Sequence, residues 1–442
     1  MDRLINSADK ANGFSTTNSG SVRIFMPLDI SLCLAGIFLL TVRLGKITGN
    51  LYISDILIFC SFLIVLSKNL ISGRLFLFKI MLTKSNPFRF PFILLTLAFM
   101  VSLYRSPNLW ENFTRYIQFA FTFTILFPLI FYYINYRAVS TKIILLTFFS
   151  GELINLATML LYAFFGYAFM DSSSSQSPLP AYAGVFAGRY TIFGNEPNEV
   201  ARLLVLPVAF LWYFIAVSKT TLKQILVWMF FLAIFIGVML TVSKTGFAII
   251  FISLVMYFVI DRPRLRISLL LASLAIAGYA GVIYLDKTLL KSRPIIERFI
   301  EIQTGQETSV SFRIEQYSNV LSDAHKYLIA GLGFDNPFSG IHNVILESLV
   351  DLGGLGVIAF SLFYAIPIFI SWHYLRVLKR SRRTSRELIL FMGGFLIGCV
   401  SLFIGDMFMT YSIERSLWLI PIMAVSYGAF LHNNPPAMNH LR

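Results

Sequence analysis

The chain has 442 residues, of which 57% are hydrophobic and only 13% are charged, and its formal net charge is +14. Soluble domains carry about 25% charged and about 45–50% apolar residues, so this composition excludes a water-soluble globule and indicates a polytopic membrane protein. The basic residues lie mainly in short connections between apolar runs, which argues against a nucleic-acid-binding protein. The three cysteines lie within apolar runs, so they provide neither a disulfide framework nor a cysteine-rich metal site.

A transmembrane helix requires about 20 consecutive, mainly apolar residues. In chain order, the segments that approach this requirement are about 25–42, 51–67, 88–104, 116–136, 143–168, 198–217, 222–241, 245–260, 266–285, 344–371, 387–405 and 415–431. We therefore predict an all-α integral membrane protein with about 12 transmembrane helices.

The distribution of Lys and Arg over the connections predicts the orientation of these helices. If the N-terminus is cytoplasmic, 22 of the 36 Lys and Arg residues lie on the inner side and 14 on the outer side, 6 of them in one long loop. The basic run from Arg376 to Arg383 is the strongest single inner anchor. We therefore expect both tails, 1–24 and 432–442, to be cytoplasmic.

Two polar insertions interrupt the apolar chain, and this orientation places both on the outer face. The first is a serine-rich loop at 171–197, within a membrane domain of nine spans at 25–285. The second, 286–343, separates that domain from a three-span membrane domain at 344–431. Two amphipathic stretches of the second insertion predict a small helical cap: 292–303 and 311–328.

His342 is the one histidine of five that lies where the long outer loop meets an apolar span. At this position water reaches the end of a helix that begins near Val344. A neutral imidazole there can take a proton from a hydroxyl group near neutral pH, so His342 is a candidate general base. The alternative interpretation is an interfacial histidine that only caps the helix.

Basic residues on the outer side indicate an anionic ligand. Arg298 and Arg313 lie on the predicted cap helices, Lys244 lies in a tight outer turn, and Arg202 lies one turn into the sixth span. Arginine binds phosphate oxygens through two parallel hydrogen bonds, whereas lysine acts as a point charge. Together these four side chains are candidate ligands of a pyrophosphate. The alternative is that they are solvated charges or contacts to acidic lipid headgroups.

Buried acids are costly in a membrane, about 2.5–3.5 kcal/mol each at a helix centre on insertion scales. Glu347 and Asp351 are four residues apart, hence on one helix face, one to two turns below His342. They are expected either to orient the histidine or a neighbouring cation, or to be satisfied structural acids. The sequence contains no D-x-D, P-loop, G-x-S-x-G or H-E-x-x-H motif, so we expect no metal and no nucleotide cofactor.

Several motifs between about 190 and 360 occur in an order that resembles one known family. His342, Asn343, Gly353 and Gly356 fit the pattern H-N-x9-G-x-x-G. The other motifs are Gly194-Asn-Glu-Pro-Asn198, Ser311-Phe-Arg313 followed by Tyr317, and Gly331-Leu-Gly-Phe. This set is similar to the bacterial O-antigen ligase and O-antigen polymerase family, whose members are multi-span glycosyltransferases with a large periplasmic loop. Gly353 and Gly356 are expected to let another helix approach closely.

The resemblance implies roles for the candidate residues. It makes His342 the base that activates an acceptor sugar hydroxyl. It makes Arg313, and less directly Arg298, a ligand of the pyrophosphate of an undecaprenyl-linked glycan donor. The turn at Lys244 stands where the family has a Ser-Arg motif, so lysine replaces the usual arginine there. Asn343 and Glu347 are expected to orient the histidine.

The implied function is metal-independent transfer of an undecaprenyl-pyrophosphate-linked glycan to a sugar hydroxyl, with inversion, on the periplasmic side of the bacterial inner membrane. We favour polymerisation of O-antigen or other surface-polysaccharide repeat units, in which the acceptor is another lipid-linked glycan. The alternative within the family is a ligase that joins the glycan to lipid A-core. The alternative of another class is a flippase for lipid-linked oligosaccharides, which predicts internal repeats or helices broken near the bilayer midplane.

Overall fold

The structure is a computed structural model of the chain. It describes residues 26–42, 46–48, 51–73, 76–82, 86–137, 139–165, 183–186, 189–192, 197–241, 243–261, 308–334, 336, 341–381, 384–408 and 415–434. Four predicted features lie wholly or largely outside these ranges: the ninth span at 266–285, the first cap helix at 292–303 with Arg298, most of the loop at 171–197, and most of both tails.

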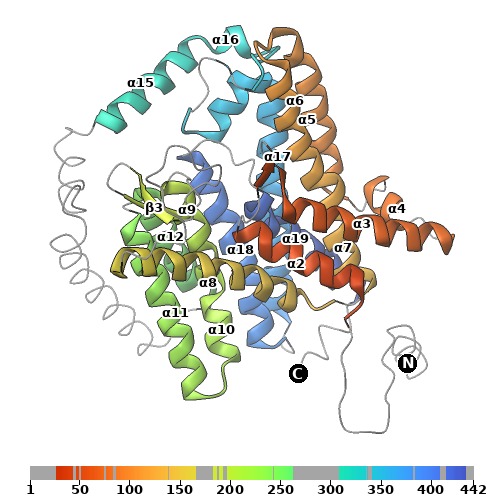
Figure 1. The fold of residues 1–442 in the computed structure, drawn as a ribbon, viewed down its shortest axis with the longest axis vertical. Helices are drawn as coiled ribbons and strands as arrows, with labels where there is room; N and C mark the ends of the chain where they lie inside the picture. The colour runs from red at the N-terminus through yellow and green to blue at the C-terminus, as the bar shows by residue number, and fades with distance from the viewer. Residues whose placement is uncertain are drawn as a thin grey trace.

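The first part of the chain is a series of helices with one short hairpin (Figure 1). Its elements are α2 (Leu28–Val42), β1 (Lys46–Thr48), β2 (Leu51–Tyr52), α3 (Ile53–Ile71), α4 (Phe76–Leu82), α5 (Arg89–Ser102), α6 (Leu109–Phe121), α7 (Phe127–Tyr136) and α8 (Thr141–Phe165). A π-helical turn at Thr122–Leu126 joins α6 to α7 without a break in the helical path.

The second part contains the remaining hairpin and the helices that carry the candidate residues. Its elements are β3 (Ala183–Phe186), β4 (Arg189–Ile192), α9 (Pro197–Val205), α10 (Leu211–Val217), α11 (Thr221–Leu240), α12 (Lys244–Asp261), α15 (Thr308–Ser322), α16 (Ala324–Tyr327), α17 (Val344–Arg380), α18 (Arg386–Met407) and α19 (Arg415–Asn433). A 3-10 turn at Leu206–Phe210 joins α9 to α10, where Pro207 cannot donate a helical hydrogen bond.

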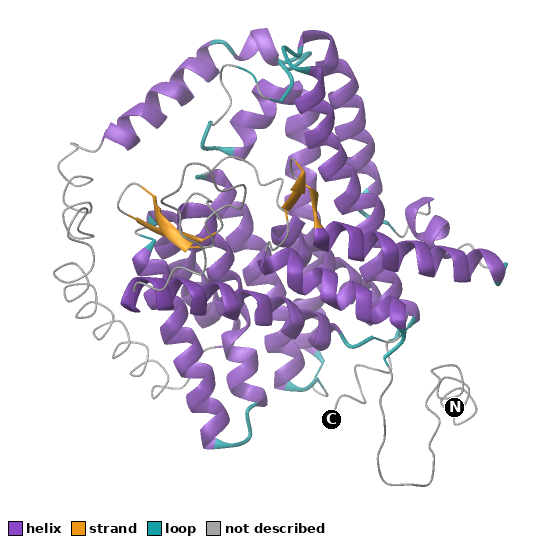
Figure 2. Cartoon of the chain, viewed as in Figure 1, coloured by secondary structure: helices purple, strands orange, loops and turns teal. Residues whose placement is uncertain are grey.

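Strands contribute little to the described chain. The two hairpins, β1–β2 and β3–β4, are both antiparallel and stand apart among the helices (Figure 2). The prediction of an all-α membrane protein therefore holds in its coarse form.

Eight helical segments of the described chain are long and apolar enough to cross a membrane. They are Ile53–Ile71, Leu109–Tyr136, Thr141–Ala163, Pro197–Val217, Thr221–Leu240, Lys244–Asp261, Val344–Arg380 and Arg386–Met407. The helices α2, α5 and α19 coincide with three further predicted spans but are not among these eight. The number of 12 spans remains a prediction.

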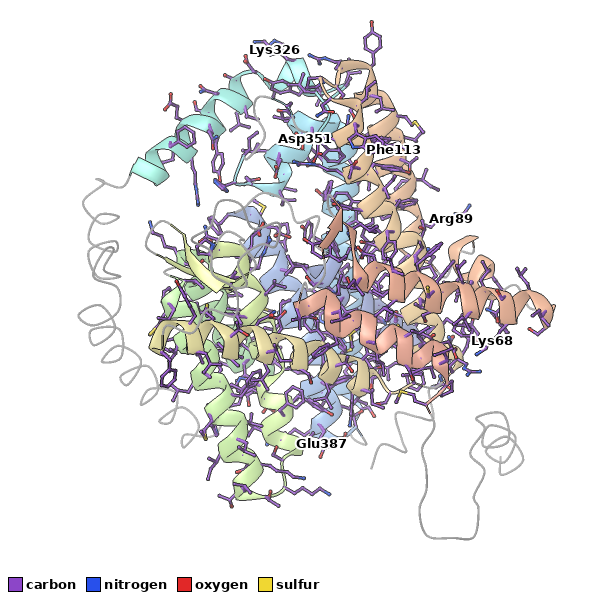
Figure 3. The ribbon with its side chains drawn as sticks, viewed as in Figure 1. Lys68, Arg89, Phe113, Lys326, Asp351 and Glu387 are labelled. Atoms are coloured by element: carbon purple, nitrogen blue, oxygen red, sulfur yellow. The ribbon has the colours of Figure 1, made fainter. Side chains whose placement is uncertain are left out.

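The helices do not all run in one direction. In Figure 1, α5, α6 and α17 rise toward α16, whereas α2, α3 and α8 run across the view. Lys326 of the cap and Glu387 at the start of α18 therefore mark opposite ends of the molecule, while Lys68 lies at its side (Figure 3). The loop after α3, which the sequence predicts to be an inner connection, does not lie beside Glu387.

A cluster of aromatic rings packs between helices at the centre of the bundle. Phe123 stacks on Phe363 with ring centroids 4.1 Å apart, and both pack against Trp418. Because lipid tails are as apolar as these side chains, close van der Waals packing rather than hydrophobic burial holds such helices together. Trp418 also contacts Tyr364, so this cluster fixes the position of a hydroxyl group that belongs to the candidate site.

The predicted orientation can be tested with single cysteines in a variant that lacks the three native ones. The exposed Ser318 on α15 and the exposed Lys219 between α10 and α11 are suitable positions. We expect Ser318→Cys to react with a membrane-impermeant maleimide in cells whose outer membrane is permeabilised, and Lys219→Cys to react only after the inner membrane is opened. The opposite pattern would contradict cytoplasmic termini.

Candidate active site

His342 lies immediately before α17, and its neighbour forms the helix cap. The Asn343 side chain accepts hydrogen bonds from the backbone N–H groups of Ile345 and Leu346, at 3.0 and 3.1 Å. This satisfies two of the N–H groups that a helix start leaves without intrahelical partners. His342 is therefore not the capping residue, and its imidazole does not serve that purpose.

The cap helix α15 holds the His342 backbone in place. The Tyr317 hydroxyl donates to the His342 carbonyl oxygen at 2.5 Å. The His342 side chain is half-buried, and its Nδ1 atom has no hydrogen-bond partner within the described part of the chain. A buried nitrogen without a partner is costly in a stable core, and it is a suitable acceptor for a proton from a substrate hydroxyl.

The surroundings of His342 keep its imidazole neutral. Burial, and then the positive charge of Arg313, lower the pKa of His342 from 6.5 to about 4. Both causes act against the charged form, because one removes water and the other places a like charge nearby. His342 and Arg313, which the sequence nominated separately, are thus electrostatic neighbours.

Arg313 connects the cap to the end of α18. From α15, its Nη1 donates to the carbonyl oxygen of Phe408 at 3.5 Å. Phe408 follows the last residue of α18, where backbone carbonyl groups lack helical partners and the helix dipole is negative. No carboxylate pairs with Arg313 among the described residues, so its charge remains available to an anion.

Arg202 has a different environment from the one that the sequence predicts. It is 1% exposed and forms an ion pair with Asp406 on α18, which is 0% exposed. The Tyr364 hydroxyl donates to the other oxygen of the same carboxylate. Gly405 makes room for Arg202, because a Cβ atom there would lie 3.0 Å from the arginine Cδ. The Arg202 charge is therefore already compensated by Asp406. The sequence had instead predicted a phosphate ligand near the outer surface.

Asp406 and Tyr364 are site residues that the sequence interpretation missed. The signal for Asp406 was a carboxylate directly after the predicted span 387–405, which has no other charged residue beyond Glu387 at its start. Since such an acid requires a partner, it should have directed attention to a buried cation. The last turn of α18 binds both Arg202 and Arg313, so it brings two predicted phosphate ligands to one place.

Lys244 is the first residue of α12, and this end of α12 packs against α9 near Arg202. The Ser243 hydroxyl accepts from the Gly246 N–H at 3.2 Å, which starts the helix. A Cβ atom at Gly246 would lie 2.9 Å from the Cβ of Ala201, so α12 and α9 touch next to Arg202. The motif at Lys244 thus places a half-buried cation on the helix beside the Arg202 ion pair.

Glu347 and Asp351 are both buried on α17, at 2% and 1% exposure, but they have different surroundings. The charges of Glu347 and Arg202 both act on the Tyr364 hydroxyl, so Glu347 lies within electrostatic range of the buried ion pair. Asp351 instead accepts from the Asn336 side chain at 2.6 Å. Only Glu347 therefore belongs with the candidate site, while Asp351 binds the loop that precedes His342.

Gly353 of the H-N-x9-G-x-x-G pattern lies against the end of α16 and the loop that follows it. Gly353 has φ 73° and ψ −167°, which interrupts the helical backbone of α17. Beside this break, the Leu332 N–H donates to Val350 O at 2.7 Å and the Gly354 N–H donates to Leu328 O at 2.8 Å. A Cβ atom at Gly331 would lie 2.2 Å from the backbone of Asp351. A Cβ atom at Gly353 would lie 3.0 Å from the carbonyl oxygen of Tyr327, the last residue of α16, so the close approach at Gly353 is made by the end of α16 and the loop that follows it.

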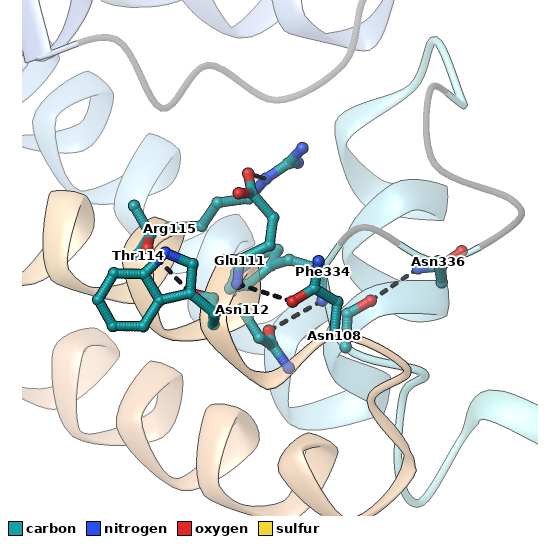
Figure 4. Close-up of polar contacts among 9 residues, drawn as sticks. Asn108, Glu111, Asn112, Thr114, Arg115, Phe334 and Asn336 are labelled. Carbon is teal, nitrogen blue, oxygen red and sulfur yellow. Dashed lines mark hydrogen bonds and ion pairs between the residues drawn. The ribbon is translucent and has the colours of Figure 1, made fainter. Parts of the chain in front are cut away.

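The same loop is also attached to the tip of the α5–α6 pair. The Asn112 side chain accepts from the Phe334 N–H at 2.9 Å, as Figure 4 shows. Arg105 donates to the carbonyl oxygens of Lys326 and Ala330, at 2.6 and 2.9 Å. The segment that leads to His342 is thus held from two sides, by α17 and by α5–α6.

The comparison with protein families agrees with the motifs. A family model described as O-antigen ligase matches residues 228–361. These residues are similar to the O-antigen ligase family. None of the curated proteins compared with the chain matches it.

The O-antigen ligase region contains most of the candidate site. It includes Lys244, Arg313, His342 and Glu347, whereas Arg202 and Asp406 lie outside it. Its family consists of glycosyltransferase-like ligases and polymerases, and the eight candidate spans agree with a membrane protein of that kind. Among the described residues, no group of three or more His, Cys, Asp or Glu side chains could hold a metal ion.

The lowered pKa of His342 predicts how stability changes with pH. An unfolded His342 binds a proton near pH 6.5, whereas the folded one does so only near pH 4, so acidification through this interval favours unfolding. We expect the stability advantage of the wild type over His342→Gln to shrink as the pH falls from 7 to 4.5, measured by thermal unfolding in detergent. The exposed His325 supplies the control, His325→Gln. An advantage independent of pH would show that the pKa is not lowered.

Proposed function

We propose that this protein transfers an undecaprenyl-pyrophosphate-linked glycan to an acceptor sugar hydroxyl on the periplasmic face of the inner membrane. The observation that carries this proposal is a neutral His342 with a buried, unpartnered Nδ1 atom beside the Arg313 cation. A base next to an anion-binding group is the minimum that displacement of a pyrophosphate by a hydroxyl requires. The match of residues 228–361 to O-antigen ligases supports the substrate class.

In the proposed reaction, His342 takes the proton of the acceptor hydroxyl as its oxygen attacks the anomeric carbon. The bond from that carbon to the pyrophosphate oxygen breaks, and undecaprenyl pyrophosphate leaves. Attack from the side opposite the leaving group inverts the anomeric configuration. Arg313 and Lys244 offset the negative charge that develops on the pyrophosphate, so no metal is needed.

The electrostatic coupling between Arg313 and His342 makes the basicity of His342 depend on donor binding. A base with a pKa of about 4 is weak in the unliganded protein. An anionic pyrophosphate next to Arg313 compensates the charge that helps to lower this pKa, so donor binding raises the basicity of His342. The acceptor hydroxyl is therefore activated more strongly when a donor is in place.

We assign positioning roles to the buried residues around the site. Asn343 fixes the start of α17 through its cap, and Glu347 lies within electrostatic range of the Arg202–Asp406 pair. Arg202 joins α9 to the end of α18, where Arg313 also binds. In this arrangement Arg202 positions the end of α18 through its ion pair with Asp406 rather than binding the phosphate directly. Arg298 stays a candidate pyrophosphate ligand on the sequence resemblance alone.

The proposed topology places membrane domains at 25–285 and 344–431, a periplasmic cap at 286–343 and both termini in the cytoplasm. We favour polymerisation, with a second lipid-linked glycan as acceptor, because lysine replaces the usual arginine at position 244. Ligation to lipid A-core is the second candidate, and the description of the matched family favours it. A flippase is the candidate of another class.

Glycan analysis in a deletion strain, complemented with variants, tests this function. We expect His342→Ala to lower glycan transfer by about 10²–10⁴-fold, because the base is lost, with no change in the membrane level of the protein. His325→Ala, which removes an exposed histidine of the cap, should keep normal activity. Near-normal transfer by His342→Ala would eliminate the base assignment.

The same strain separates the candidate functions. Single-repeat glycans alone in the deletion strain indicate a polymerase, whereas accumulated long lipid-linked chains indicate a ligase. Lipid-linked units retained on the cytoplasmic side would indicate a flippase and contradict the proposal.

Glycan transfer should depend on both the charge and the hydrogen-bonding geometry of the side chain at position 313. Arg313→Ala is expected to reduce transfer by about 10–100-fold, because a charge-assisted hydrogen bond contributes about 1.5–3 kcal/mol. Arg313→Lys should retain part of the activity, since it keeps the charge but not the paired donors. Lys326→Ala is the control, because Lys326 is an exposed cap cation that pairs with Asp323. Equal activity of Arg313→Ala and Arg313→Lys would argue against a phosphate contact that depends on charge.

A further inference from the structure

An apolar groove of about 780 Å³ lies between α12 and α17, with α18 at its base. The α17 side is a single stripe at helical spacing that runs from Ser361 through Tyr364, Ile368 and Trp372 to Lys379. The α12 side consists of its last turns, from Val255 to Ile260. Within the described part of the chain, no side chain fills this groove.

The groove reaches from Ile345, in the first turn of α17, to Lys379 near its last turn, and most of its lining lies beyond Ser361, away from the cap. Its α12 residues are the last before Asp261, and its α17 stripe approaches the basic connection that leads to Glu387, at the end opposite the cap (Figure 3). From Tyr364 to Arg376 the helix rises by about 18 Å. Half of the hydrocarbon core of a bilayer is about 15 Å thick, so the groove has the length of one acyl chain.

The end of the groove away from the cap carries positive charge. Arg376 and Lys379 line it, and the Arg376 guanidinium carbon lies 3.6 Å from the centroid of the Trp372 ring. Tryptophan and snorkelling basic side chains are typical of the level of lipid headgroups. The Trp372 ring is 41% exposed, which leaves it open to a ligand.

The positive charge at this end is not compensated by nearby acids. Among the described residues, no carboxylate forms an ion pair with Arg376 or Lys379. Asp261, the residue after the α12 lining, is already bound by Arg386 and by the Tyr257 hydroxyl. A ligand with an anionic head and an apolar tail therefore fits this end of the groove.

We propose that the groove binds an anionic phospholipid of the cytoplasmic leaflet, with its phosphate at Arg376 and Lys379 and one acyl chain along α17. Basic pockets between transmembrane helices on the cytoplasmic side bind such headgroups. The headgroup position at Arg376 and Lys379 lies at the end of α17 away from His342 and Arg313, whereas the other end of the groove reaches Tyr364 and Ile345 beside the candidate active site. The lipid site does not depend on the proposed transfer reaction.

The test measures lipid binding to the purified full-length protein by native mass spectrometry, with phosphatidylglycerol and phosphatidylcholine as probes. We expect the wild type to retain phosphatidylglycerol preferentially, and Arg376→Ala/Lys379→Ala to weaken that binding by at least about tenfold. The control, Arg380→Ala/Lys223→Ala, removes one Arg and one Lys from exposed positions that do not line the groove. Its binding should stay within about twofold of the wild type.

A second variant tests the acyl chain. Ala365 is exposed and lines the groove, so Ala365→Phe fills it without disturbing the core. We expect weaker phosphatidylglycerol binding with unchanged thermal stability in detergent. Equal loss in both double variants would show only general surface attraction. No preference between the two lipids, or no effect of Ala365→Phe, would overturn the site.

Discussion

The buried ion pair between Arg202 and Asp406 is the constraint on which the site depends. Charges without water are costly, and removing one partner of such a pair costs about 3–5 kcal/mol, so α9 and the end of α18 are held together. The Tyr364 hydroxyl binds the same carboxylate and is fixed in turn by the aromatic cluster around Trp418. The end of α18 is therefore held in place, and Arg313 of the cap binds the carbonyl group of Phe408, directly after its last residue.

The cap is attached to α17 where the helix is interrupted at Gly353. The positive φ there exposes backbone groups that the loop from Leu328 to Gly333 satisfies, and the tip of α5–α6 holds the other side of the loop. The chain then enters α17 through the Asn343 cap, and His342, directly before this cap, lies within electrostatic range of Arg313. Backbone hydrogen bonds thus hold the segment that leads to His342, and a buried ion pair holds the end of α18 to which Arg313 binds.

The sequence predicted the parts that depend on local chemistry. Apolar runs located helices at eleven of the predicted spans, and the place of His342 at a helix mouth indicated a base that the structure keeps neutral. The Arg202–Asp406 pair was missed because its members are 204 residues apart, so only the packing of α9 on α18 brings them together. The break at Gly353 was missed because glycine alone does not determine whether a helix bends, packs closely or ends. Likewise, two acids four residues apart gave no indication that one lies within electrostatic range of the ion pair and the other binds a loop.

We propose that His342 and Arg313 act as one unit in a reaction that exchanges a pyrophosphate for a sugar hydroxyl. The most direct test of this proposal is a reaction of the purified protein, in proteoliposomes and with a metal chelator present, with a single lipid-linked repeat unit. We predict release of undecaprenyl pyrophosphate together with an elongated glycan whose new linkage has the inverted anomeric configuration. Movement of the lipid-linked glycan across the bilayer without release of undecaprenyl pyrophosphate would contradict it.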